Sequence, residues 1–287
     1  MTRCMSRHSL FSQECRCKRR GRGPSIFVSD LMSGDHRDIV ICRDPEEAST
    51  RAAELFVRLA DEAIAATGRF AVALSGGSTP KALYALLATD QFRRRVPWSR
   101  VHLFWGDERC VPPDHPESNY RMAREVLLDK VPIPAQNIHR MPAEQEDPRL
   151  AAAAYKERLR VFFALEPGEM PRIDLILLGM GEDGHTASLF PGTTALTETE
   201  RLVVSVYVEK LGTHRLTLTV PVINHAAHVV FLITGKSKAS VLREVLEGEH
   251  RPQRFPSQLI RPVDGTLVFI IDREAARDLT ASGAQEL

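Results

Sequence analysis

The sequence predicts an α/β protein built on a mainly parallel, Rossmann-like open sheet with helices on both faces. Short and almost continuously apolar runs, such as FAVAL and DLILL, are typical of strands buried on both sides. These runs alternate with amphipathic helical segments, which is the pattern of a doubly covered parallel sheet. The chain has 287 residues, 43% of them hydrophobic and 26% charged, so it can bury a sizeable globular core.

The predicted elements alternate from residue 38 onward. A strand at 38–44 leads into a helix at 44–68, with Asp44 as its N-cap, Pro45 in its first turn and Gly68 after its last. The later elements are predicted in this order: a strand at 69–75, a helix at 79–88, a strand at 101–106, helices at 119–131 and 148–165, strands at 172–179, 202–208, 215–220 and 228–235, a helix at 236–248, a strand at 265–272 and a helix at 273–279.

The chain is predicted to consist of two segments that differ in charge and in sequence pattern. Residues 38–287 are predicted as a single α/β domain, and residues 1–37 as a basic, disordered N-terminal extension. Residues 1–24 carry seven Lys and Arg against one Glu, so a net charge of +1 for the whole chain leaves about −5 for the rest. The extension lacks the apolar stretch of a secretory signal. An early start codon with Met32 nearer the true start, or an Arg-rich transit peptide, stay open as alternatives.

Composition also argues against several classes of function. No apolar run reaches the roughly 18 residues of a membrane span. The net charge of about −5 on the residues that follow 1–24 is not that of a nucleic-acid-binding protein. Five cysteines without zinc-ligand spacing predict no metal site and no structural disulfide, which favours a reducing, cytoplasmic location.

Chemistry-bearing residues follow four of the predicted strands. Because ligands of open α/β sheets bind beyond the carboxyl ends of strands, these four stretches should meet at one site. They are SGGSTPK at 75–81, GDERC at 106–110, GMGEDGH at 179–185 and GKSK at 235–238.

The stretch SGGSTPK opens a helix with two glycines. Gly76 and Gly77 would let the backbone approach a ligand closely, and Ser78 or Thr79 would cap the helix. The exposed N–H groups and the helix dipole suit a phosphate. The alternative is an ordinary turn in which both hydroxyls only cap.

Cations and carboxylates follow the other strands. Asp107 and Arg109 come directly after an apolar strand, where charge is costly unless it is paired or used. We expect Arg109 to neutralise charge on substrate or oxyanion, and Arg215 and Lys238 to clamp a phosphate with the Ser78–Thr79 turn. The alternatives are a solvated loop with Asp107 paired to Arg109, and plain surface cations.

The stretch GMGEDGH supplies the candidate base. His185 is the side chain best matched to proton transfer near neutral pH, and Asp183 can fix its tautomer. Gly179, Gly181 and Gly184 permit a tight loop with free backbone N–H groups. No nucleophile elbow accompanies it, so the expected chemistry is His185 acting on water or on a substrate proton.

At these residues the chain resembles the glucosamine-6-phosphate isomerase/6-phosphogluconolactonase family. The matching stretches are LSGGSTPKALY, WGDERCVPPDHPESNY, LLGMGEDGHTASLFPG, HRLTLTVPVINHA and GKSKA, which lie in this order between residues 74 and 239. The resemblance extends over about residues 38–280. The resemblance implies hydrolysis of 6-phospho-D-glucono-1,5-lactone without a cofactor. It implies His185, Asp183 and Arg109 as catalytic residues, and the following groups as substrate- or phosphate-binding: Gly76, Gly77, Ser78, Thr79, Asp107, Gly181, Arg215 and Lys238.

Two other functions stay open within this resemblance. The isomerase/deaminase branch usually carries a tyrosine after its Asp-Glu pair and a glutamate five residues after the loop histidine; here Arg109 and Phe190 stand there. A non-catalytic phosphosugar-binding module would have no need of Asp183 and His185 together. The implied partner is a small phosphosugar lactone, with neither nucleic acid nor membrane, and the protein is expected to be a monomer or a weak homo-oligomer.

Overall fold

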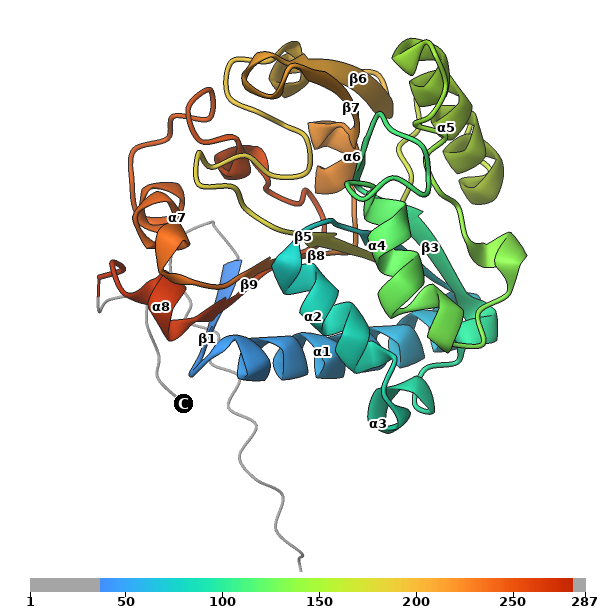
Figure 1. Cartoon of the computed structure of the whole chain (residues 1–287), viewed down its shortest axis with the longest axis horizontal. Helices are drawn as coiled ribbons and strands as arrows, with labels where there is room; N and C mark the ends of the chain where they lie inside the picture. The colour runs from blue at the N-terminus through green and yellow to red at the C-terminus, as the bar shows by residue number, and fades with distance from the viewer. Residues whose placement is uncertain (1–36, 281–287) are drawn as a thin grey trace, which may run out of the picture. The chain divides into compact units, whose positions relative to one another are not determined.

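Six strands form an all-parallel sheet in the order β1-β9-β8-β5-β2-β3 (Figure 1). The computed structural model describes residues 37–280. β2 and β5 lie in the middle of the sheet and are buried along their whole length, which explains their continuous apolar sequences. The strands are β1 Arg37–Cys42, β2 Phe70–Leu74, β3 Val101–Trp105, β5 Leu175–Leu178, β8 His228–Ile233 and β9 Thr266–Asp272.

The register of this sheet gathers the loops of interest at one edge. Leu74 at the end of β2 pairs with Trp105 at the end of β3, and Leu178 at the end of β5 pairs with Phe231 near the end of β8. The chain runs from β2 outward to β3 and later returns to β5 on the other side of β2. The crevice between β2 and β5 is therefore the topological switch point, where ligands of open α/β sheets bind.

Helices cover both faces of the sheet, as predicted. α1 packs against β1, β2 and β9 and shares its face with α2, whereas Figure 1 shows α6 and α7 on the opposite side. Among the described residues no helix is both long and apolar enough to cross a membrane. The helices are α1 Pro45–Thr67, α2 Ser78–Leu87, α3 Asp90–Arg93, α4 Asn119–Val126, α5 Pro148–Phe163, α6 Val220–Asn224, α7 Ala239–Leu246 and α8 Arg273–Ala276.

A second, antiparallel sheet was not predicted. β4 (Asp107–Arg109), β7 (Thr213–Leu218) and β6 (Val203–Val208) pair in the order β4-β7-β6. The Gly106 N–H donates to Leu74 O, and the Leu218 N–H donates to Gly106 O, so this sheet is joined to the end of β2. The alternative of a solvated loop at GDERC is wrong, because Asp107 and Glu108 lie in a buried strand.

The helix ends test the capping predictions. Asp44 caps α1 by accepting from the Glu47 N–H at 2.8 Å, and Gly68 ends it in the left-handed conformation at φ 80°, both as predicted. The prediction that Ser78 or Thr79 caps α2 is wrong: Gly77, at φ 109°, is the N-cap, and no side chain bonds there. The extension predicted for 1–37 lies, except for Arg37, outside the described residues.

Candidate active site

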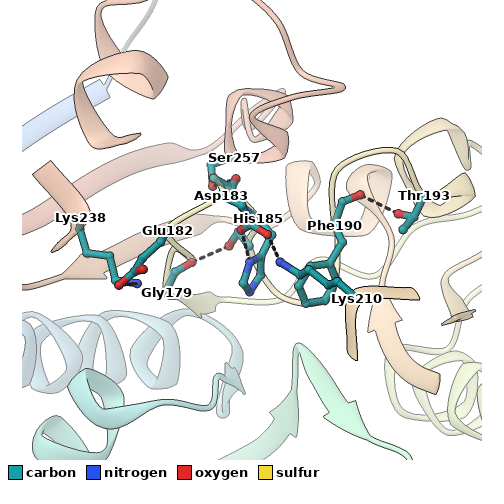
Figure 2. A network of polar contacts seen from close by, with 11 residues as sticks. Gly179, Glu182, Asp183, His185, Phe190, Thr193, Lys210, Lys238 and Ser257 are labelled. Carbon is teal, nitrogen blue, oxygen red and sulfur yellow. Dashed lines mark hydrogen bonds and ion pairs between the residues drawn. The ribbon is translucent and has the colours of Figure 1, made fainter. Parts of the chain in front are cut away.

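The loop after β5 holds a histidine and an aspartate in direct contact. Oδ1 of Asp183 lies 2.5 Å from Nδ1 of His185 and also accepts the His185 backbone N–H at 3.2 Å (Figure 2). This contact places the proton of a neutral imidazole on Nδ1, which leaves Nε2 as the basic nitrogen. Both side chains are about one-third exposed or less, so the pair is partly shielded yet reachable.

Gly181 makes room for this pair. A Cβ at Gly181 would lie 2.0 Å from Nδ1 of His185 and 2.8 Å from Oδ1 of Asp183, so no other residue fits. The loop is closed by backbone hydrogen bonds from the Gly181 N–H to His185 O and from the Gly184 N–H to Gly181 O. For Gly181 and Gly184 the expectation of free N–H groups is therefore wrong, because the tight loop uses them for its own hydrogen bonds.

Two further side chains complete the surroundings of the histidine. The ring of Phe190 stacks on His185 with centroids 4.1 Å apart, and Nζ of Lys210 pairs with Oδ2 of Asp183. Burial alone would raise the pKa of Asp183, but hydrogen bonds from His185 and Lys210 hold it well below its usual range. Asp183 therefore stays ionised throughout the pH range in which His185 can act as a base.

The carboxylates of β4 are structural partners of the neighbouring loops. Asp107 accepts from Ser188 Oγ at 2.7 Å and from Asn119 Nδ2 at 3.3 Å, which ties β4 to the histidine loop and to α4. Glu108 accepts the backbone N–H groups of Asn119 and Tyr120 and so holds the start of α4. Both oxygens of Asp107 are thus engaged by the protein.

Two arginines lie opposite each other on neighbouring strands of the second sheet. Arg109 pairs in register with Arg215, and the guanidinium of Arg109 donates to Glu117 O at 2.5 Å rather than to Asp107. Arg215 is only 8% exposed, and its Nε and Nη1 have no hydrogen-bond partner. Burial, and then the charge of Arg109, lower the pKa of Arg215. A buried cation with unused N–H groups beside a like charge is a strong receptor for an anion.

The turn after β2 lies beside the turn after β8. Tyr84 Oη bonds both the N–H and the carbonyl of Ser75, which fixes the turn, and Thr79 Oγ1 lies 2.9 Å from Thr234 Oγ1. Lys238 lies in the 3-10 helix η6 (Lys236–Lys238) and reaches to 3.9 Å from Glu182 in the histidine loop. Gly76, Gly77 and Ser78 therefore lie at the N-terminus of α2, beside the turn that leads to Lys238.

The structure thus brings together most of the predicted residues and adds some that the sequence did not single out. The four predicted strand ends meet, and the contacts Thr79–Thr234, Glu182–Lys238 and Ser188–Asp107 join them. Asn119, Ser188 and Lys210 were missed because they become neighbours of the site only through the second sheet and its loops. Within residues 37–280, no group of three or more His, Cys, Asp and Glu side chains is placed to hold a metal ion.

A family model, a relative of known sequence and a solved structure that resemble this chain all carry the name 6-phosphogluconolactonase. The family model for glucosamine-6-phosphate isomerases/6-phosphogluconolactonase matches residues 43–269. A 6-phosphogluconolactonase of Synechocystis sp. is 50% identical over 218 residues, covering 76% of this chain and 88% of the relative. The structure of 6-phosphogluconolactonase from Trypanosoma cruzi matches with a TM-score of 0.77 at 34% identity, over 85% and 97% of the two chains. A monomeric glucosamine-6-phosphate deaminase matches with a TM-score of 0.70 over 84% and 99%, but at 22% identity that likeness concerns the fold alone.

Proposed function

Because the chain belongs to the glucosamine-6-phosphate isomerase/6-phosphogluconolactonase family, we propose that it carries out the lactonase reaction with His185 as the general base. The protein hydrolyses 6-phospho-D-glucono-1,5-lactone to 6-phospho-D-gluconate, the second oxidative step of the pentose phosphate pathway. The observation that carries the proposed mechanism is the contact between Asp183 and His185 at the switch point of the sheet. A single base suffices for this reaction, because water is the nucleophile.

The first step is attack of water on the lactone carbonyl. Nε2 of His185 takes a proton from the water as its oxygen bonds to C1, while Asp183 holds Nδ1 and stabilises the imidazolium that forms. The tetrahedral intermediate then collapses, and the bond between C1 and the ring oxygen breaks. The imidazolium returns its proton to that oxygen, which becomes the C5 hydroxyl, and the new carboxylic acid ionises in water.

A cation is the best candidate to stabilise the oxyanion. The N–H groups of Gly181 and Gly184 are engaged within the loop itself, and we assign Arg109 to the developing charge. Arg109 is partly exposed, and its guanidinium donates to the Glu117 carbonyl oxygen, so a substrate oxygen can compete for its N–H groups. Its position beside Arg215 gives two cations on one side of the site.

The 6-phosphate is remote from the reacting carbon and serves to position the substrate. We assign it to the backbone N–H groups of the Gly76–Thr79 turn, with Lys238 and Arg215 as its cations. Two observations support this assignment: Arg215 has unused N–H groups in a buried position, and Thr79 contacts the turn that leads to Lys238.

The alternative reaction of the family fits these residues less well. Isomerisation and deamination of an amino sugar phosphate need a second acid–base group at the reacting carbons. At the position of the family's glutamate, Phe190 lies flat on the ring of His185 and cannot move a proton. A non-catalytic phosphosugar module would not require the Asp183–His185 contact.

The test is a coupled assay with purified protein. The lactone is generated from glucose 6-phosphate by its dehydrogenase, and excess 6-phosphogluconate dehydrogenase reports the product as NADPH. We expect the protein to exceed the uncatalysed rate, His185→Ala to lose that acceleration and the exposed control His250→Ala to retain it. Acceleration by His185→Ala at the wild-type rate would move the base elsewhere. No acceleration by the wild type would reject the lactonase function, and glucosamine 6-phosphate would be tested next.

Location and assembly form a separate proposal. We place the protein in the cytoplasm as a monomer or a weak homo-oligomer; the free thiols of Cys42 and Cys110 support a reducing compartment. Cell fractionation with an antibody and light scattering of the purified protein would test the two statements separately.

A further inference from the structure

We propose that Lys210 is a positioning residue for the Asp183–His185 pair. It acts from the tip of the β6–β7 hairpin on the loop after β5, which carries the general base His185. The proposal rests on the proposed function, since it concerns the same reaction. Lys210 contacts Asp183 and lies beside Phe190, and Asp183 in turn contacts His185 (Figure 2).

The two oxygens of Asp183 have separate partners. Oδ1 accepts from His185, and Oδ2 is bound by Nζ of Lys210, which also lies 4.7 Å from the centre of the Phe190 ring. Phe190 in turn stacks on His185, so lysine, carboxylate, imidazole and phenyl ring form one closed cluster. Rotation of the carboxylate would break the contact of Lys210 as well as that of His185.

The hairpin is built to deliver this lysine. Lys210 is the middle residue of the 3-10 helix η5 (Glu209–Leu211), which joins β6 to β7. Gly212 follows it in the left-handed conformation at φ 61°, and its N–H bonds the carbonyls of Val208 and Glu209. This closed turn fixes the direction in which Lys210 leaves the hairpin.

An exposed ion pair of this kind adds little to folding. The side chain of Lys210 is half exposed, and pairs at such positions contribute roughly 0–1 kcal/mol to stability. The pair is placed instead where orientation matters, because it connects the second sheet to the aspartate that sets the tautomer of the base. Among the described residues Lys210 is the one Lys or Arg paired with Asp183; Lys238 approaches Glu182.

The kinetic test compares Lys210→Met with Lys210→Arg and with Lys156→Met, an exposed lysine on α5. We expect Lys210→Met to lower kcat about tenfold with KM within a factor of about two, and Lys210→Arg to restore most of it. An unchanged kcat, or a rise in KM with unchanged kcat, would overturn the proposal; the latter would mean that Lys210 contacts substrate instead.

A spectroscopic test works without activity. In protein labelled with ¹⁵N-histidine, we expect the His185 ring of the wild type to show the Nδ1–H tautomer, and Lys210→Met to show a mixture of tautomers, as should Asp183→Asn. A wild-type tautomer in Lys210→Met would overturn the positioning role. If the wild type had no lactonase activity, the proposed function would fail, but these spectra would still decide the role of Lys210.

Discussion

Replacement of His139 by phenylalanine should reduce the loss of stability in mild acid. The His139 ring is buried, stacks on Phe104 with centroids 4.4 Å apart, and places Nε2 3.3 Å from Nδ1 of His102. Its Nδ1 has no hydrogen-bond partner. A proton there would therefore be poorly solvated, and phenylalanine would keep the aromatic stack without a titrating group.

The size of the effect follows from the pKa of the buried ring. Burial, and then the charges of His102 and Arg158, lower the pKa of His139 from 6.5 to about 4. Since the unfolded chain binds the proton at higher pH, the free energy of unfolding falls as pH drops below about 6.5, and the fall ends near pH 4. Between pH 7.5 and pH 5 the titration of this histidine should lower the free energy of unfolding by about 2 kcal/mol. Below pH 4 the loss relative to pH 7.5 should reach about 3 kcal/mol.

The assay is urea unfolding at pH 7.5 and at pH 5, followed by the fluorescence of the buried Trp98 and Trp105. The difference in free energy of unfolding between the two pH values should be about 2 kcal/mol smaller in His139→Phe than in the wild type. The exposed control His115→Gln should keep the wild-type difference. If His139→Phe lost as much stability as the wild type between these pH values, the assignment of the acid sensitivity to this ring would be wrong.

Three further predictions concern the active site. Gly181→Ala should lower kcat about a hundredfold by displacing the His185 ring, whereas Gly179→Ala, with open space at its Cβ, should stay near wild type in steady-state kinetics. Arg215→Met should raise KM about tenfold yet raise the free energy of unfolding by about 1 kcal/mol in urea titrations, because it removes an unpaired buried cation. Phe190→Glu should lower lactonase activity without releasing ammonia from glucosamine 6-phosphate, since Arg109 stands where the deaminase branch usually carries a tyrosine.

Much of the fold could be predicted because each parallel strand carries its own signal. The apolar runs of β2 and β5 require burial on both faces, and the helices between them have readable ends, such as Asp44 and Gly68 at α1. The glycines and the histidine that follow β5 stand at a strand end, where the topology predicts ligands. The Asp183–His185 contact needs only a two-residue separation, so it could be predicted as well.

The second sheet could not be predicted from local pattern. β4 has three charged residues, DER, and becomes a strand because its backbone pairs with β7, more than a hundred residues later in the chain. Glu108 is buried there because backbone N–H groups of α4 receive its carboxylate. Such non-local partners override the propensity of a short polar segment.

That second sheet carries three cations of the proposed site. The parallel sheet supplies the turn at Gly76–Thr79 and the loop of His185, which follow β2 and β5. Arg109, Arg215 and Lys210 all come from β4, β7 and the β6–β7 hairpin, and Asp107 fastens β4 to the histidine loop through Ser188. The groups that we assign to the oxyanion and to the orientation of the base therefore lie on one small antiparallel sheet. Changes within that sheet should alter the reaction while leaving the parallel core intact.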